Sequence, residues 1–259
     1  RDKRVHLVGE DLLDPYGGAF KVANGLSTNF PDRVWTTPIS ESAIVGIGVG
    51  MALRGLRPVV EIMFGDFLTL AADQIINHSA KFRWMFNDMV RVPLVVRTPM
   101  GGRRGYGATH SQSLEKHFLG VPGLWVVAPS VFGDPGRLLE QATLECDDPV
   151  LFIESKTCYG RPLFETPEGM RRERLDSEVA PFPTWFFSWP DTAPDGLFCC
   201  YGAMAPILGE ATRFLAEMEG LYCDLAVFTQ LSPTPTSHLS RLLERRPPVC
   251  VLAEEASSM

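Results

Sequence analysis

Three side chains of this chain are of types that do chemistry and stand where a ligand could reach them: Glu41, Phe67 and His110. Glu41 lies where a strand-like run over 34–37 gives way to a helix-like run over 41–54. Side chains at the carboxyl end of a strand in an open α/β sheet face the crevice where ligands bind, so a carboxylate there could exchange a proton with a ligand. His110 follows a glycine-rich loop, a setting that suits a substrate-facing side chain.

Each of these residues also has an ordinary interpretation. An acidic residue is favoured in the first turn of any helix, which would account for Glu41. Most phenylalanines pack in a core, although Gly65 and Asp66 would let the chain approach a ligand closely at Phe67. His110 could be a loop histidine that bonds to backbone. The residue types alone leave both interpretations open.

The elements that must position these residues alternate between strands and helices. Strands are expected over 5–8, 34–37, 59–64, 92–97, 124–128 and 149–154, and helices over 19–30, 41–54, 68–85, 114–119 and 136–145. This alternation predicts an α/β fold with a mostly parallel sheet. Gly46, Gly48 and Gly50 lower the helix propensity of 41–54, so we expect close packing against a neighbouring element there.

Residues 1–160 are expected to form the first domain. Over 161–194 prolines interrupt every periodic pattern, which predicts a linker that passes over the surface. The alternation restarts over 195–259, with strands expected at 196–201, 222–228 and 248–253 and helices at 206–219 and 238–245. This second α/β unit is smaller, and because it stops just after its third strand we expect it to be truncated.

The composition excludes some functions. The net charge of -7 and the lack of a basic cluster argue against a nucleic-acid partner. No apolar stretch is long enough to span a bilayer, so no membrane association is expected. The 6 cysteines show no C-x-x-C spacing, and we interpret them as reduced thiols of a cytoplasmic protein.

Several short motifs, in order, carry a resemblance to a known family. They are Gly9-Glu10-Asp11, Thr37-Pro38-Ile39-Ser40-Glu41, Gly55-Leu56-Arg57-Pro58, Asp73-Gln74-Ile75, Ala80-Lys81 and His110-Ser111-Gln112-Ser113. Together they resemble the beta subunit of thiamine-diphosphate-dependent 2-oxo acid dehydrogenases of the pyruvate, branched-chain and acetoin types, within the transketolase-like superfamily. The resemblance covers nearly the whole chain and is most specific over 5–164.

The resemblance implies a fold and a set of site residues. The fold would be a parallel-sheet pyrimidine-binding domain of thiamine enzymes, followed by a smaller α/β domain of the transketolase C-terminal type. Glu41 matches the glutamate that contacts the aminopyrimidine ring and, by sharing a proton with it, promotes formation of the thiazolium ylide. Ile39 and Phe67 match further cofactor contacts, and Phe67 would stack on the pyrimidine. His110 matches a histidine near the reacting carbon, whereas His78 has no matching role.

The resemblance also implies metal ions and a partner chain. The family places a potassium ion among main-chain carbonyls, and the matching positions are Leu94, Thr143, Leu144, Cys146 and Asp148. The magnesium ion that holds the diphosphate needs a Gly-Asp-Gly motif, which this sequence lacks. The family places that motif on an alpha-type subunit, so an α2β2 heterotetramer is implied. A lipoyl protein or an acyl-carrier protein would accept the acyl group.

Three functions remain open at this point. The leading one is a beta-type subunit that decarboxylates a 2-oxo acid and transfers the acyl unit. The alternatives are a transketolase-like or acyloin-forming carboligase subunit in a biosynthetic pathway, and a non-catalytic assembly subunit of the same fold. The basic pair Arg103 and Arg104 departs from the family pattern, and in a carboligase it would favour an anionic substrate.

Overall fold

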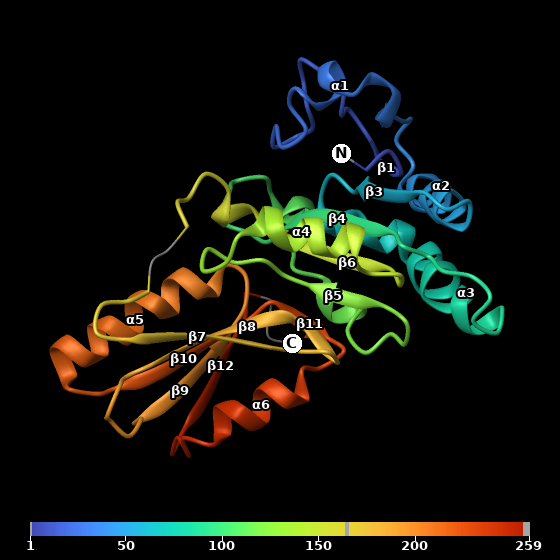
Figure 1. Ribbon diagram of the computed structural model, residues 1–259. Helices are drawn as coiled ribbons and strands as arrows, with labels where there is room; N and C mark the ends of the chain where they lie inside the picture. The colour runs from blue at the N-terminus through green and yellow to red at the C-terminus, as the bar shows by residue number, and fades with distance from the viewer. Residues whose placement is uncertain (1, 164–165, 256–259) are drawn as a thin grey trace.

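The computed structural model describes residues 2–163 and 166–255, and its larger sheet has seven strands (Figure 1). In spatial order they are β11 (Gln230–Ser232), β5 (Trp125–Val127), β6 (Val150–Ser155), β4 (Val95–Met100), β3 (Arg57–Glu61), β1 (Val5–Gly9) and β2 (Val34–Thr36). All neighbouring pairs are parallel except β11 with β5. The predicted mostly parallel α/β sheet is therefore confirmed.

Helices cover both faces of this sheet because its central strands alternate apolar side chains on each side. Val60 and Val96 pack with α2 (Glu41–Leu53) in one core cluster, and Val59 and Val95 pack with α4 (Pro135–Leu144) in another. Gly48 allows the close approach of α2, since a Cβ there would lie 2.6 Å from a methyl group of Val60. The close packing expected of the α2 glycines is confirmed at that position.

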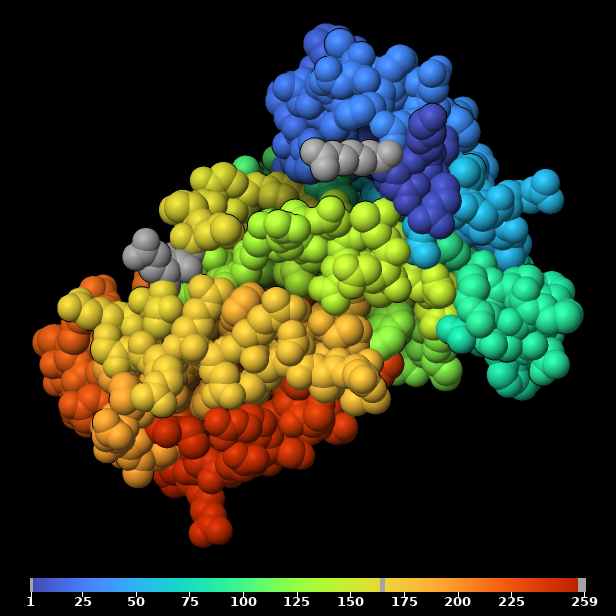
Figure 2. Space-filling view, in the orientation of Figure 1, coloured from blue at the N-terminus to red at the C-terminus, as the bar shows by residue number. Residues whose placement is uncertain are grey.

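The smaller sheet has five strands and lies beside the first (Figure 1). In the space-filling view the yellow-to-red half of the chain borders the green part of the first unit (Figure 2). Its order is β12 (Cys250–Ala253), β9 (Gly196–Cys200), β10 (Cys223–Phe228), β8 (Ala180–Ser188) and β7 (Arg171–Ser177). β12, β9 and β10 are parallel, and β8 and β7 run antiparallel. α5 (Met204–Glu219) packs on one face and α6 (Thr236–Leu243) on the other.

Two sequence-based expectations are wrong. Residues 171–188, expected to be part of a linker, form the β7–β8 hairpin. The helix expected over 19–30 is reduced to α1 (Leu26–Asn29), because Lys21 and Gly25 adopt left-handed φ angles of 58° and 82° that end any regular helix. The expected domain boundaries at 160 and 195 stay a prediction.

The segment expected as one helix over 68–85 is helical but not uniform. It begins as a 3-10 helix at Gly65–Ala71, continues as a π-helix at Gln74–Ser79 and ends as α3 (Ala80–Met85). Only Glu115–His117 is helical in the expected helix over 114–119. Irregular helices of this kind are frequent at functional sites, and the first of them carries Phe67.

Candidate active site

Two carboxylates meet at the carboxyl edge of the first sheet. Glu41 is the first residue of α2, and Glu10 directly follows β1; each is only 7% exposed. Burial raises the pKa of Glu10, and the nearby charge of Glu41 raises it further, followed by that of Asp11. Among the described residues, Oε1 of Glu10 is buried and has no hydrogen-bond partner. This edge therefore holds an acid pair with an unused acceptor.

An aromatic cluster surrounds His110. The imidazole ring meets Phe64 edge-on with 4.8 Å between ring centroids and Phe67 with 5.2 Å. The rings of Phe64 and Tyr106 also touch, with their centroids 5.6 Å apart. The structure thus brings together Phe67 and His110, two residues that the sequence placed in one site from segments far apart in the chain.

Asp66 connects this cluster to its surroundings. Its Oδ1 atom accepts hydrogen bonds from the backbone N of Gln112 at 3.1 Å and from the side-chain Nε2 of the same residue at 2.9 Å. On the other side of the 3-10 helix, the hydroxyl of Ser42 donates to the carbonyl of Leu70. The segment with Phe67 is therefore joined both to the start of α2, next to Glu41, and to the loop of His110.

Lys156 is a buried cation behind the loop of His110. It directly follows β6, has 0% exposure, and its Nζ atom donates to the backbone carbonyl of His110. Nζ also lies 5.2 Å from the ring centroid of Phe64 and 5.6 Å from that of Tyr106. Burial lowers the pKa of Lys156, and the charge of Asp66 opposes the shift.

A buried ion network fixes the strand ends beneath this site. The guanidinium of Arg97 on β4 bonds to Glu61 on β3 and to Glu154 on β6, with Nε 3.0 Å from Oε1 of Glu154. The hydroxyl of Tyr159 adds a contact at 3.0 Å to Arg97. Burial raises the pKa of Glu61; Arg97 opposes this rise and Glu154 adds to it. Three neighbouring strands thus end in one fixed polar frame.

Ile39 lies outside the buried part of the site, because its side chain is 81% exposed. It precedes the N-cap residue Ser40, whose side chain makes no capping bond. Its role as a cofactor contact stays a prediction.

Part of the predicted potassium site is already occupied by a protein cation. Nη1 of Arg57 donates to the carbonyl oxygens of Thr143 at 3.0 Å and Cys146 at 2.9 Å. The carbonyl of Leu94 accepts from the backbone N of Val150, and the carboxylate of Asp148 pairs with Arg83. A potassium ion would have to share these carbonyls, so the predicted set, with Leu144, stays a prediction.

Within the described ranges no group of three or more His, Cys, Asp or Glu side chains could hold a metal.

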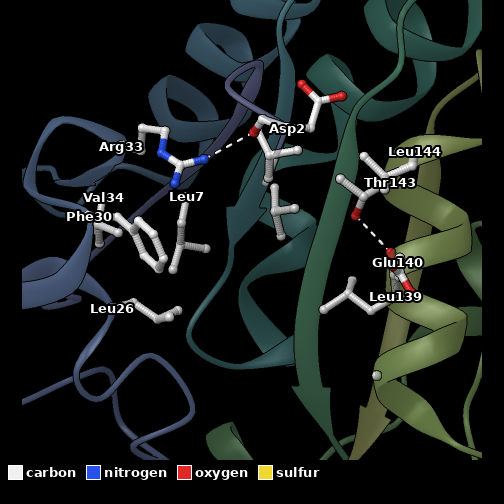
Figure 3. A pocket seen from close by; sticks show the side chains of 13 residues that line it. Asp2, Leu7, Leu26, Phe30, Arg33, Val34, Leu139, Glu140, Thr143 and Leu144 are labelled. Atoms are coloured by element: carbon white, nitrogen blue, oxygen red, sulfur yellow. Dashed lines mark hydrogen bonds between the residues drawn. The ribbon is translucent and has the colours of Figure 1, made fainter.

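A separate apolar cavity of about 340 Å³ lies on the α4 face of the first sheet (Figure 3). Leu26 and Phe30 point toward it from one side and Leu139 from the other. At its rim Arg33 donates to the carbonyl of Asp2 at 3.0 Å. Neither Glu41 nor His110 lines this cavity, so we do not assign chemistry to it.

These residues offer groups that a heterocyclic ligand with donor and acceptor nitrogens could use. The unpaired oxygen of Glu10 and the buried carboxylate of Glu41 can exchange protons with such a ligand. Half-buried Phe67 offers a ring face, and His110, whose loop is held by buried Lys156, can act as an acid or a base.

The comparisons with known proteins identify the family of the chain. A family model described as "Transketolase, pyrimidine binding domain" matches residues 1–162. The chain belongs to this family.

Curated relatives of this chain are beta subunits, which confirms the resemblance found in the sequence. The acetoin:2,6-dichlorophenolindophenol oxidoreductase subunit beta of Cupriavidus necator is 38% identical over 242 residues, which are 90% of this chain and 68% of that protein. The pyruvate dehydrogenase E1 component subunit beta-1 of Arabidopsis thaliana is 43% identical over 235 residues, or 90% and 62%. The 2-oxoisovalerate dehydrogenase subunit beta of Bacillus subtilis is 45% identical over 160 residues, or 61% and 48%. The chain thus spans about half to two thirds of the length of these relatives.

A solved structure supports the fold of the family. The protein described as "Split gene transketolase, inactive beta4 tetramer" has a TM-score of 0.69 over 98% of this chain and 73% of its own, at 20% identity. Among the described residues, no helix has the length and apolar character needed to cross a membrane.

Sequence reasoning assigned no role to Glu10, Asp66, Lys156 or the network around Arg97. Glu10 and Lys156 each directly follow a strand whose carboxyl end reaches the site, and that position was the signal available in the sequence. For Asp66 the only indication in the sequence was its position next to Phe67. The pairing of Arg97 with two strand neighbours could not be foreseen without the strand order.

Proposed function

We propose that this chain is the beta-type subunit of a thiamine-diphosphate-dependent enzyme that decarboxylates a 2-oxo acid and transfers the acyl unit. The observation that carries the proposal is Glu41, a buried carboxylate at the start of α2 and at the same sheet edge as Glu10. The next residue of the chain, Ser42, lies at the same helix start and bonds to the segment of Phe67, whose ring contacts His110. The beta-subunit relatives named above support the same reaction class.

In this proposal each residue has a defined task. Thiamine diphosphate, when bound, would supply the nucleophilic carbon that decarboxylation of a 2-oxo acid requires. Glu41 exchanges a proton with the pyrimidine ring, and Glu10, whose pKa is raised by burial and by the charge of Glu41, lies at the same edge. Phe67 and Ile39 contact the cofactor ring. His110 holds or delivers a proton at the substrate end and is kept in place by Phe64 and Lys156.

The proposal includes a partner chain. The described residues contain no cluster suited to magnesium, so an alpha-type subunit is proposed to hold magnesium and the diphosphate in an α2β2 heterotetramer. Ile39 and Leu70, 81% and 58% exposed, flank the start of α2 and form an apolar rim suited to such a partner. A potassium ion at the carbonyls near Arg57, a lipoyl or acyl-carrier acceptor and a cytoplasmic location, where the free thiols would stay reduced, complete the proposal.

Reconstitution tests the proposal directly. The chain is co-expressed with the alpha-type subunit, supplied with thiamine diphosphate, magnesium and candidate 2-oxo acids, and the release of carbon dioxide is measured. Turnover is expected only with both chains and is expected to disappear in Glu41→Gln, because the amide cannot exchange the proton. Glu140→Gln, at an exposed position of α4, is the matched control and should keep full turnover. Carbon dioxide release by this chain alone, or full turnover in Glu41→Gln, would contradict the proposal.

A second candidate is a carboligase subunit that transfers a two-carbon unit to an anionic acceptor. Arg103 and Arg104, in the loop before His110, are the observation that favours it. Formation of a carbon–carbon bond when an aldehyde is added to the reconstituted enzyme would identify it. The non-catalytic alternative predicts no turnover with any substrate.

A further inference from the structure

A second cavity, of about 420 Å³, lies beside the candidate active site and is lined by three arginines. Arg103 and Arg104 reach it from the glycine-rich loop, and Arg161 reaches it from the segment that follows β6. Its volume is within the range of small-molecule sites. The cavity therefore gathers cations from two separate segments in a chain whose net charge is -7.

Within residues 2–163 and 166–255, the side chains of Arg103, Arg104 and Arg161 form no hydrogen bond or ion pair. The acidic residue that lines the cavity is Glu255, and its Oε1 accepts a hydrogen bond from the backbone N of Gly102 at 3.0 Å. Among the described residues that line the cavity, three positive charges face one negative charge. Like charges gathered without partners repel one another, and a bound anion would relieve that repulsion.

The fold adds to the positive potential at the same place. Met204, the first residue of the 16-residue helix α5, lines the cavity, and the first turn of α5 contains no acidic residue. A helix N-terminus carries a partial positive charge that favours anions nearby. This contribution is secondary to the three arginines.

The cavity adjoins the cluster around His110. Tyr159 lines the cavity, and its ring packs on Phe20 with 5.3 Å between centroids. Phe20 packs on Phe64 at 5.5 Å, and Phe64 packs on His110 at 4.8 Å. A ligand that reacts beside His110 could thus extend its far end along these rings into the cavity.

We propose that this cavity is an anion subsite that binds a phosphate monoester group of the substrate or acyl acceptor. The inference rests on the proposed function for the identity of that molecule. A phosphate monoester carries a charge near -2 at neutral pH, so it would interact favourably with three arginines that have no ion-pair partner among the described residues. Guanidinium forks bind phosphate oxygens with two parallel hydrogen bonds, and several of them can share one phosphate.

Calorimetric titration of the full chain, together with its alpha-type partner, tests the subsite. The probe is glycerol 3-phosphate, with glycerol and glutarate as comparison ligands. Arg104→Gln and Arg161→Gln are each expected to weaken binding about tenfold, because each removes a charge-assisted hydrogen bond. Arg213→Gln, an exposed position on the same helix α5, removes the same charge and should bind as the unchanged protein does.

The outcomes separate the subsite from the proposed function. Equal weakening by Arg213→Gln, no binding of glycerol 3-phosphate, or binding of glycerol with the same affinity would overturn the subsite. If glutarate bound more tightly than glycerol 3-phosphate, the cavity would be a site for a carboxylate ligand, and the proposed phosphate class would be wrong. Arginine-dependent phosphate binding without any thiamine-dependent turnover would leave the subsite standing and refute the proposed function. Thiamine-dependent turnover, together with phosphate binding that the arginine variants leave unchanged, would support the proposed function and refute the subsite.

Discussion

The Nζ atom of Lys156 donates a hydrogen bond to the backbone carbonyl of His110. This bond connects the end of β6 to a loop in which Gly101, Gly105 and Gly107 all adopt positive φ angles. Glycine loses more conformational freedom on folding than other residues, so such a loop needs a fixed contact to hold one conformation. Lys156 provides that contact from a fully buried position.

Lys156→Met should therefore loosen the loop before His110. We expect faster hydrogen exchange over 101–112 and about a tenfold loss of turnover in the reconstituted enzyme, because a misplaced acid–base group costs orders of magnitude. Hydrogen exchange followed by mass spectrometry measures the first effect. Lys81→Met, which removes an exposed lysine bonded to Asn77, is the control and should change neither. Unchanged exchange in Lys156→Met would show that the contact does not order the loop.

His110→Ala should slow the chemical steps more than it weakens cofactor binding. The ring of His110 lies against Phe64 and Phe67 on a glycine-rich loop, a setting that suits a substrate-facing side chain. We expect a loss of about a hundredfold in turnover, a usual size for a positioned acid or base. Calorimetry of thiamine diphosphate binding should give an affinity within a few fold of the unchanged enzyme.

His78→Ala is the matched control for that experiment. His78 lies on a helix, half exposed, and pairs with Asp73. Its replacement should leave both measurements unchanged. If His110→Ala instead abolished cofactor binding and kept turnover at saturation, the substrate-side role of His110 would have to be given up.

Glu10→Gln should stabilise the protein at neutral pH but not in acid. The pKa of Glu10 in the folded chain lies above its ordinary value of 4.5, so the folded state keeps the proton while the unfolded state loses it as pH rises. Stability therefore falls as pH rises above 4.5 through the folded pKa, and the amide removes that penalty. In Glu10→Gln the free energy of unfolding is expected to rise by about 1 kcal/mol at pH 7.5, which corresponds to roughly 2–4 °C in Tm, and not to rise at pH 4.

Thermal unfolding at the two pH values measures this difference. Glu178→Gln, at an exposed turn between β7 and β8, is the control and should shift Tm by less than a degree at either pH. An equal shift at pH 4 and pH 7.5 in Glu10→Gln would mean that ionisation of Glu10 is not its cause.

Gly123→Ala should destabilise the fold far more than Gly120→Ala. Both glycines have left-handed φ angles, 83° and 75°, in the same loop after Phe118. A Cβ at Gly123 would lie 2.1 Å from the backbone oxygen of Ala80, whereas a Cβ at Gly120 would meet nothing within 4 Å. In urea unfolding we expect the free energy of unfolding to fall by about 1 kcal/mol in Gly120→Ala and by more than about 2 kcal/mol in Gly123→Ala. Equal losses would show that only the φ angle matters.

The sequence was sufficient for elements whose own residues determine them. The helix that starts at Glu41 and the apolar central strands follow from local periodicity, and the structure has them within a few residues of the expected bounds. The pairing of Phe67 with His110 came from the resemblance. The bond from Lys156 could not be foreseen, because it depends on how a glycine-rich loop folds back onto β6.

The β7–β8 hairpin was missed because its prolines were interpreted as breakers. Pro181 and Pro183 lie in β8 before its pairing with β10 begins at Thr184. They also lie near the register shift of β7 between Leu175 and Ser177. A proline lacks the N–H that a ladder needs, so it is tolerated where no such bond is required. The local composition does not show which backbone N–H groups will pair with a strand that lies far away in the sequence.

The antiparallel pairing of β11 with β5 makes the larger sheet dependent on residues from the second half of the chain. During synthesis β5 emerges long before β11, so its outer edge stays open until most of the chain has been made. An unpaired strand edge is a template for aggregation, and closing a long loop delays the contact that would cover it. A fragment ending at residue 162 should therefore be prone to self-association, even though it contains the whole family match.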